Sequence, residues 1–187
     1  MENIIKNELD AILQQMDLDH TSKKFRDRLD EGSLTRSENS QSHFCVCLLL
    51  IDLNIQKVFL SHHKKSNFWL CFGGHLEFGE NIKSAANREL KEEIGLRSCN
   101  LRLTDPEYLS TTLIENPKKD SCRLHFDVWH FIRTSIADFP ADPMFVQDEF
   151  YRQNWFSIKE ARQLPTSKSM LKAIDFVEFN IFNQNVQ

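Results

Sequence analysis

A glycine-bearing loop that runs into a short, acid-rich helix constrains this chain more than any other stretch of its sequence. The loop covers residues 74–80, and apolar residues then recur at three- and four-residue steps through residues 81–95. That period predicts a helix whose apolar face packs against a sheet. Asn81 is the expected N-cap and Gly95 the expected left-handed C-cap. The predicted apolar face comprises Ile82, Ala85, Ala86, Leu90 and Ile94.

Three carboxylates leave one face of this helix, because Glu89, Glu92 and Glu93 stand at positions i, i+3 and i+4. Like charges at that spacing repel, so the arrangement favours a bound cation. Mg²⁺ and Mn²⁺ prefer oxygen ligands, and the trio therefore predicts a site for one of them. A solvated acidic helix end is the more common meaning of such a cluster taken alone. Arg88 is placed to reach back to Glu80 through a bidentate pair.

The spacing of the whole segment decides between these interpretations. Nine specified positions fall within 23 residues, and they are Gly74, Glu80, Arg88, Glu89, Leu90, Glu92, Glu93, Gly95 and Leu96. This pattern matches the Nudix box without a departure, and the chain resembles the Nudix hydrolases, which cleave nucleoside diphosphates linked to a second group. It is also similar to a bacterial subgroup in which a helical segment precedes the domain and an aspartate follows a histidine, as in His125-Phe126-Asp127.

The resemblance implies an α/β fold, an α/β/α sandwich with a mixed β-sheet, over residues 41–187. Ahead of it, residues 1–40 are predicted to be a helical extension with a linker, because helical periods cover residues 3–16 and 21–29. This hairpin is interpreted as a lid, a substrate-shaping wall, a dimer surface or a packing element, and the last is favoured. The predicted strands are residues 44–51, 57–62, 68–72, 101–113, with a break around Asp105-Pro106, and 122–132. The predicted later helices are 158–164 and 167–182.

The resemblance also implies roles for individual residues. The expected metal ligands are Glu89, Glu92, Glu93 and the carbonyl of Gly73. The candidate catalytic residues are Glu92, Glu93, Arg88 and Glu149, the last because a later loop often supplies an acid in this family. An ordinary loop carboxylate is an equally good interpretation of Glu149. The loop itself is expected to be held in shape by Gly74, Glu80 and Gly95.

Substrate contacts are expected from side chains that flank the box, namely His75, Lys64, Trp69 and His125. Lysines at a turn are more often solvated, and core packing is the commoner role of any single aromatic residue. A histidine metal site is disfavoured because the sequence has no H-x-x-x-H pattern or Cys/His spacing of the zinc type.

The composition of the chain limits the classes of partner and the compartment that are expected for it. The net charge is −4 and the pI about 6.0, so no broad basic surface for nucleic acid is expected. The longest apolar run, residues 44–51, is too short to cross a bilayer, and the first residues lack the pattern of a signal peptide. Five cysteines without a C-x-x-C pair favour free thiols in a reducing, cytoplasmic compartment. A monomer and a homodimer are both open.

The leading hypothesis is a pyrophosphohydrolase that uses Mg²⁺ or Mn²⁺ and cleaves a nucleotide or another small diphosphate. A Nudix-fold module that senses a nucleotide without cleaving it is the alternative, although a sensor has no need of the glutamate trio. A third hypothesis is an RNA-end pyrophosphohydrolase. It predicts a basic channel for RNA, which the net negative charge of the chain disfavours.

Overall fold

The computed structural model describes residues 2–16, 19–95, 101–114, 122–140 and 149–186. Leu96, Cys99, the predicted loop at residues 116–120 and most of that at 140–143 lie outside these ranges. The main elements are α1 (Glu2–Gln15), α2 (His20–Asp30), β1 (Ser42–Asp52), β2 (Lys57–His63), β3 (Trp69–Leu70), β4 (Phe72–His75), α3 (Ile82–Ile94), β5 (Tyr108–Leu113), β6 (Leu124–Arg133), β7 (Phe150–Ser157), α4 (Ile158–Ala161) and α5 (Lys168–Phe176), which continues as a π-helical turn (Val177–Phe182). Within the described residues, no helix is long and apolar enough to cross a membrane.

The strands form one seven-stranded sheet in the order β3-β2-β1-β6-β5, with β4 paired to β1 and β7 paired to β2. Antiparallel pairing joins β2 to β1, to β3 and to β7, and β5 to β6. Strand β1 is nearly continuous in apolar residues and is buried along almost its whole length, as expected of a strand covered on both faces. The chain divides into two compact units.

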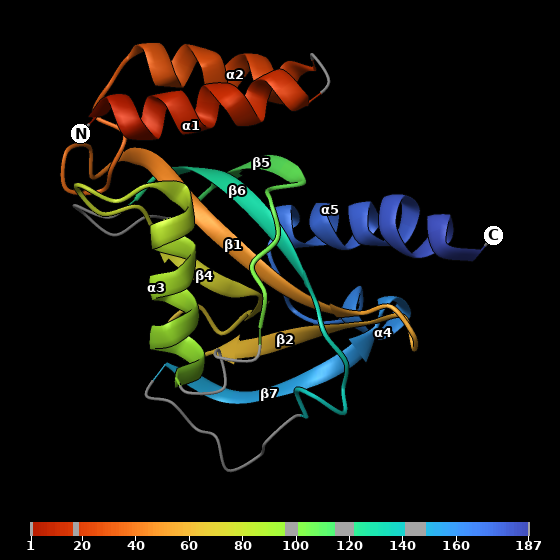
Figure 1. Cartoon of the computed structure of the whole chain (residues 1–187). Coiled ribbons are helices and arrows are strands. Elements are labelled where there is room, and N and C mark those ends of the chain that lie inside the picture. Colours follow the sequence, from red (N-terminus) through yellow and green to blue (C-terminus); the bar gives the residue numbers. More distant parts are fainter. Residues whose placement is uncertain (1, 17–18, 96–100, 115–121, 141–148, 187) are drawn as a thin grey trace. The chain divides into compact units, whose positions relative to one another are not determined.

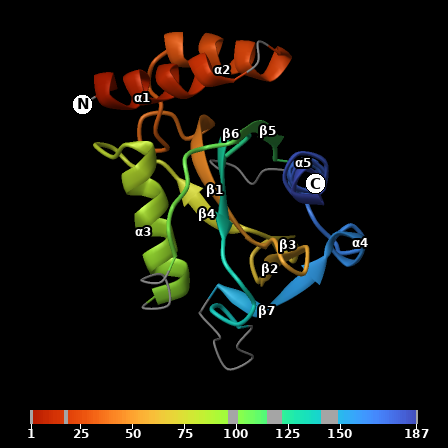
Figure 2. The same ribbon diagram turned by 45° about the vertical axis from the view of Figure 1, so that its right-hand side comes forward.

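The first unit comprises residues 1–47, 73–89 and 105–130. Its helices α1 and α2 lie side by side (Figures 1 and 2). The ring of Phe25 in α2 packs edge-on against Phe44 and Phe126, with centroid distances of 5.6 and 5.2 Å. These contacts hold Phe25 of α2 against β1 and β6.

A buried guanidinium also fastens α2 to the strand that follows it. Arg28 donates hydrogen bonds to the carbonyl oxygens of Gly32, Ser33 and Ser42 at 2.6 to 2.7 Å, and to the Ser42 hydroxyl at 3.3 Å. Its side chain is 3 % exposed, and burial lowers the pKa of the guanidinium. A buried charge is tolerated when its donors are satisfied in this way.

The second unit comprises residues 48–72, 90–104 and 131–187. Strand β7 pairs with β2 over seven residue pairs, from Lys57 with Ser157 to His63 with Phe150. Phe59 on β2 contacts the rings of Phe139 and Trp155 at 5.1 and 5.2 Å. The indole of Trp155 donates to the Phe139 carbonyl at 2.8 Å, so the buried indole has the polar partner that it needs.

Several predicted boundaries were wrong. The strand predicted at residues 101–113 begins only at Tyr108, and the helix predicted at 158–164 ends at Ala161. Strand β7 was not predicted at all, because its polar residues do not form a continuous apolar run. Ile4 is an apolar residue of the helical period predicted for residues 3–16, which would place it on the buried face, but it is 54 % exposed.

Candidate active site

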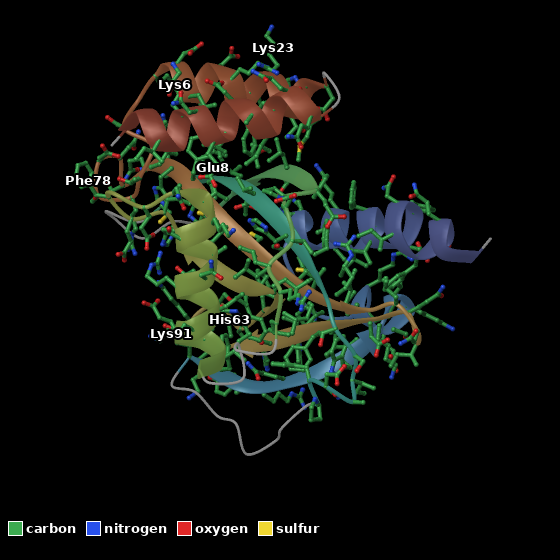
Figure 3. The ribbon with its side chains drawn as sticks, in the orientation of Figure 1. Lys6, Glu8, Lys23, His63, Phe78 and Lys91 are labelled. Atoms are coloured by element: carbon green, nitrogen blue, oxygen red, sulfur yellow. The ribbon has the colours of Figure 1, made fainter. Side chains whose placement is uncertain are left out.

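Helix α3 begins and ends as its sequence predicts. The Asn81 side chain accepts a hydrogen bond from the Ser84 N–H at 2.8 Å, and Gly95 adopts a φ of +63°. The five predicted apolar side chains are all buried. One further contact was not predicted: a carboxylate oxygen of Glu8, on α1, accepts a hydrogen bond from the Ile82 N–H at 2.7 Å (Figure 3).

Arg88 organises the loop in front of the helix. Its Nε and Nη2 atoms donate to the two carboxylate oxygens of Glu80 at 2.7 and 2.9 Å, which confirms the predicted bidentate pair. Nη1 donates to Glu89 at 2.7 Å, and Nη2 also donates to the His75 carbonyl at 3.0 Å. Hydrogen bonding from Arg88 lowers the pKa of Glu80, and that of Arg88 is raised in turn.

Two adjacent glycines, Gly73 and Gly74, lie so close to neighbouring atoms that neither position has space for a Cβ atom. A Cβ on Gly74 would stand 2.3 Å from the Glu89 carboxylate, so the absence of a side chain lets that carboxylate lie against the backbone. A Cβ on Gly73 would stand 2.1 Å from the Val46 carbonyl oxygen, and Gly73 has a φ of +131°. Gly74 therefore leaves space for the carboxylate of Glu89, whereas Gly73 allows the close approach of β4 to the backbone of β1.

The acidic trio differs in burial along α3. Glu89 is 9 % exposed and Glu93 is 6 % exposed, whereas Glu92 is exposed. Carboxylates so deeply buried need positive charge nearby, and Arg88 supplies it to Glu89. The trio as a donor set fits a hard divalent cation that prefers oxygen.

Three other predicted site residues, Lys64, Trp69 and Glu149, belong to the second unit. Lys64 and Glu149 are both exposed, and the Lys64 N–H donates to the Glu149 carbonyl at 2.9 Å. Trp69 is buried: His62 stacks on it at 5.0 Å, and the Arg152 guanidinium lies 5.1 Å from its ring centroid. A substrate stacking on Trp69 would have to displace these neighbours.

His75 and His125 are brought together, and two residues absent from the sequence-based site join them. The ligand atoms of His43, His75, Cys122 and His125 all lie within 4.8 Å of one another, and these four residues are called the His–Cys cluster below. Burial lowers the pKa of His43 and lowers that of His125 to about 4, so both imidazoles are neutral at pH 7. No local spacing signals the cluster, because its members come from three separate segments.

A buried carboxylate stands next to the cluster. Asp127 accepts hydrogen bonds from Ser110 and Thr112, and Ser110 accepts one from the Trp129 indole at 2.8 Å. Burial raises the pKa of Asp127 to about 6. Burial also raises the pKa of the Cys45 thiol well above its usual range, so this thiol stays protonated.

Residues 41–175 match the NUDIX domain family, and this match spans most of the chain. The chain belongs to the Nudix family. Among the described residues, Cys45, Cys47, Cys71 and Cys122 form no disulfide.

Individual relatives agree with this assignment. The m7GpppN-mRNA hydrolase NUDT17 of Xenopus laevis is 44 % identical over 57 residues, and this Nudix chain spans only 19 % of the length of that protein. Dihydroneopterin triphosphate pyrophosphohydrolase of E. coli shares the fold, with a TM-score of 0.58 and 21 % identity over 73 % of this chain and 93 % of that one. An Ap4A hydrolase of C. elegans does so with a TM-score of 0.53 and 18 % identity over 75 % and 98 %.

The predicted fold class, a mixed sheet with helices and two helices ahead of it, is thereby confirmed. The predicted enzyme class is confirmed at the level of the family, which acts on phosphoanhydrides and generally uses divalent metals.

Proposed function

We propose that this Nudix chain is a pyrophosphohydrolase that requires Mg²⁺ or Mn²⁺ and cleaves a nucleoside diphosphate linked to another moiety. The observation that carries the proposal is the arrangement around Arg88. One guanidinium binds Glu80, Glu89 and the His75 carbonyl at once. It thereby ties the loop to the first glutamate of a helix that carries two more.

Glu89, Glu92 and Glu93 would hold the cation, with the Gly73 carbonyl as a further candidate ligand. Such an ion would neutralise the diphosphate and activate water for attack on phosphorus. Arg88 has each of its donor-bearing nitrogens engaged with the protein, so its proposed role is to position Glu89 rather than to contact substrate. Gly74 complements that role by leaving space for the same carboxylate.

The general base is proposed to be a box glutamate or Glu149. Glu92 and Glu149 are exposed, whereas Glu93 is buried. A proton acceptor must reach solvent-derived water, and exposure favours Glu92 and Glu149 for that task. Comparing the pH–rate profiles of Glu92→Gln and Glu149→Gln separates them: removal of the base flattens the acidic limb, and removal of the other residue leaves it in place.

The nucleobase contact is proposed to involve Phe78, which sequence reasoning did not single out. Phe78 lies in the box loop, two residues before Glu80, and is 61 % exposed (Figure 3). An exposed aromatic ring offers a stacking surface for any base. Lys64 is retained as a candidate phosphate contact because its ammonium is exposed.

A panel of nucleotides with Mg²⁺ or Mn²⁺ tests the function. It should contain nucleoside triphosphates, nucleotide sugars, dinucleoside polyphosphates and cap dinucleotides, the last because of the name of the Xenopus relative. We expect release of a nucleoside monophosphate from at least one compound, and loss of that activity in Glu93→Gln with retained circular dichroism. Binding without hydrolysis across the panel would support a nucleotide sensor instead. Unchanged turnover in Glu93→Gln would reject the proposed ligand set.

A further inference from the structure

The His–Cys cluster has the donor set of a metal site. Three imidazole rings surround one another with centroid distances of 4.7, 5.1 and 5.1 Å. The Cys122 sulfur lies 3.5 Å from Nε2 of His75. Around a tetrahedral Zn²⁺, nitrogen and sulfur ligands at about 2.0 to 2.3 Å stand roughly 3.3 to 3.7 Å from one another. The observed separation already matches one edge of that tetrahedron.

The orientation of His43 favours a ligand role. Its Nδ1 lies 2.8 Å from the Asn39 carbonyl oxygen, which only accepts hydrogen bonds. Nδ1 must therefore carry the proton, and Nε2 presents a lone pair. A carbonyl that fixes the tautomer of a histidine in this way is a common support for metal ligands.

Two nitrogens of the cluster are buried without a hydrogen-bond partner among the described residues. They are Nε2 of His43 and Nε2 of His125. A buried polar atom left without a partner costs about 1–3 kcal/mol, and native structures seldom leave two in one place. Coordination of a cation would satisfy both at once.

Neighbouring charges and neighbouring donor atoms also affect metal binding by the cluster. Arg36 acts on both His43 and His125, and its positive charge opposes a bound cation. A metal bound by Cys122 would take it as the thiolate, and the negative charge of that ligand would compensate for Arg36. Cys45 and Asp127 also approach His125 within 4.8 Å, but that second set has three members against four in the His–Cys cluster.

We propose that His43, His75, Cys122 and His125 bind one Zn²⁺, at a site separate from the box glutamates. Three nitrogen ligands and one sulfur ligand suit zinc rather than Mg²⁺ or Mn²⁺. Four protein ligands leave no open position, so the ion has a structural role. It would join the start of β1, the end of β4, the segment before β6 and the start of β6, all within the first unit.

Cobalt substitution tests this site without reference to hydrolysis. The full chain is stripped with a chelator and titrated with Co²⁺ in excess Mg²⁺, so that the glutamates do not take up the probe. We expect one equivalent of tetrahedral Co²⁺ with a thiolate-to-cobalt charge-transfer band, which Zn²⁺ abolishes by displacement. Carboxylates cannot produce that band, so failure of the proposed hydrolase function would leave this result intact.

Matched cysteine variants assign the ligand. Cys122→Ser should lose the charge-transfer band and weaken zinc binding at least tenfold, whereas Cys71→Ser, a thiol of similar exposure outside the cluster, should keep both. His125→Gln should weaken binding to a similar degree, and zinc should raise the melting temperature of the unmodified chain but not of Cys122→Ser. Absence of the band in the unmodified chain, or its persistence in Cys122→Ser, would overturn the proposal.

Discussion

The carboxylate of Glu8 accepts a hydrogen bond from the backbone N–H of Ile82, 74 positions along the chain, at 2.7 Å. The acceptor belongs to α1 and the donor is the first residue of α3. The N-terminal extension therefore contributes a cap to the helix that carries the glutamate trio. A negative charge at this end also suits the dipole of α3.

Glu8→Ala should lower the free energy of unfolding by about 1 kcal/mol, because it removes a helix cap. Glu8→Gln should lose less, since its amide oxygen still accepts the hydrogen bond. Urea unfolding followed by circular dichroism measures both. Glu77→Ala, which removes an exposed glutamate from the nearby loop, is the control and should change little. Equal free energies of unfolding for Glu8→Ala and Glu77→Ala would show that the hydrogen bond between Glu8 and Ile82 does not stabilise the fold.

Gly74→Ala should damage catalysis more than folding. Its Cβ would meet the flexible carboxylate of Glu89, which can swing away but then leaves its position. We expect kcat to fall at least tenfold and the calorimetric affinity for Mn²⁺ to fall with it. Gly73→Ala is the contrasting variant: its Cβ would meet the Val46 backbone, and its φ disfavours a side chain, so the melting temperature should fall. A Gly74→Ala enzyme with full activity would argue against the assigned place of Glu89.

Arg88→Lys should keep the charge but lose the fork that binds Glu80 through two nitrogens. We expect kcat/KM to fall about 10- to 100-fold, the range seen when groups that orient metal ligands are removed. Arg162→Lys is a matched control, because Arg162 binds Asp175 through two nitrogens elsewhere in the chain. Steady-state kinetics should show a much larger loss of kcat/KM in Arg88→Lys than in Arg162→Lys. Similar losses in both variants would contradict the proposed role of Arg88 in positioning Glu89.

Phe78→Ala should raise KM about tenfold with little change in kcat, because stacking on a base is worth about 1–3 kcal/mol. Phe179→Ala removes an equally exposed ring from the C-terminal helix and is the control. Kinetics with the substrate found in the panel provide the measurement. If both variants leave KM unchanged, the base is bound elsewhere.

His63 should make stability depend on pH. Burial lowers its pKa, its Nε2 is buried without a hydrogen-bond partner among the described residues, and its ring lies edge-on to Phe150 at 4.5 Å. As the pH falls below about 6.5, the unfolded chain takes up a proton before the folded chain does, so the free energy of unfolding decreases. His63→Phe removes this proton uptake.

Chemical unfolding of His63→Phe between neutral and mildly acidic pH should therefore show a shallower decline than the unmodified chain. In the metal-free chain, His43 and His125, whose pKa values are also lowered, contribute to the decline that remains. Parallel curves for the two proteins would contradict the assignment.

Local sequence signals predicted the helix and its loop well. Asn81, Gly95 and the Arg88–Glu80 pair depend on residues within a few turns of one another, so spacing was enough. Strand β7 depends on β2, which lies about 90 residues earlier, and only that pairing makes its polar sequence a strand. The His–Cys cluster forms in the same way, from segments that only the fold brings together. Spacing rules for zinc describe sites built from neighbouring residues, so they did not apply to it.

The guanidinium of Arg28 limits how this enzyme can admit a substrate. Moving α2 away from β1 would break the hydrogen bonds from Arg28 to the hydroxyl and carbonyl of Ser42 and would uncover the Phe25 ring, which packs against Phe44 and Phe126. If the hairpin were a mobile lid, these contacts would have to break and re-form in every turnover.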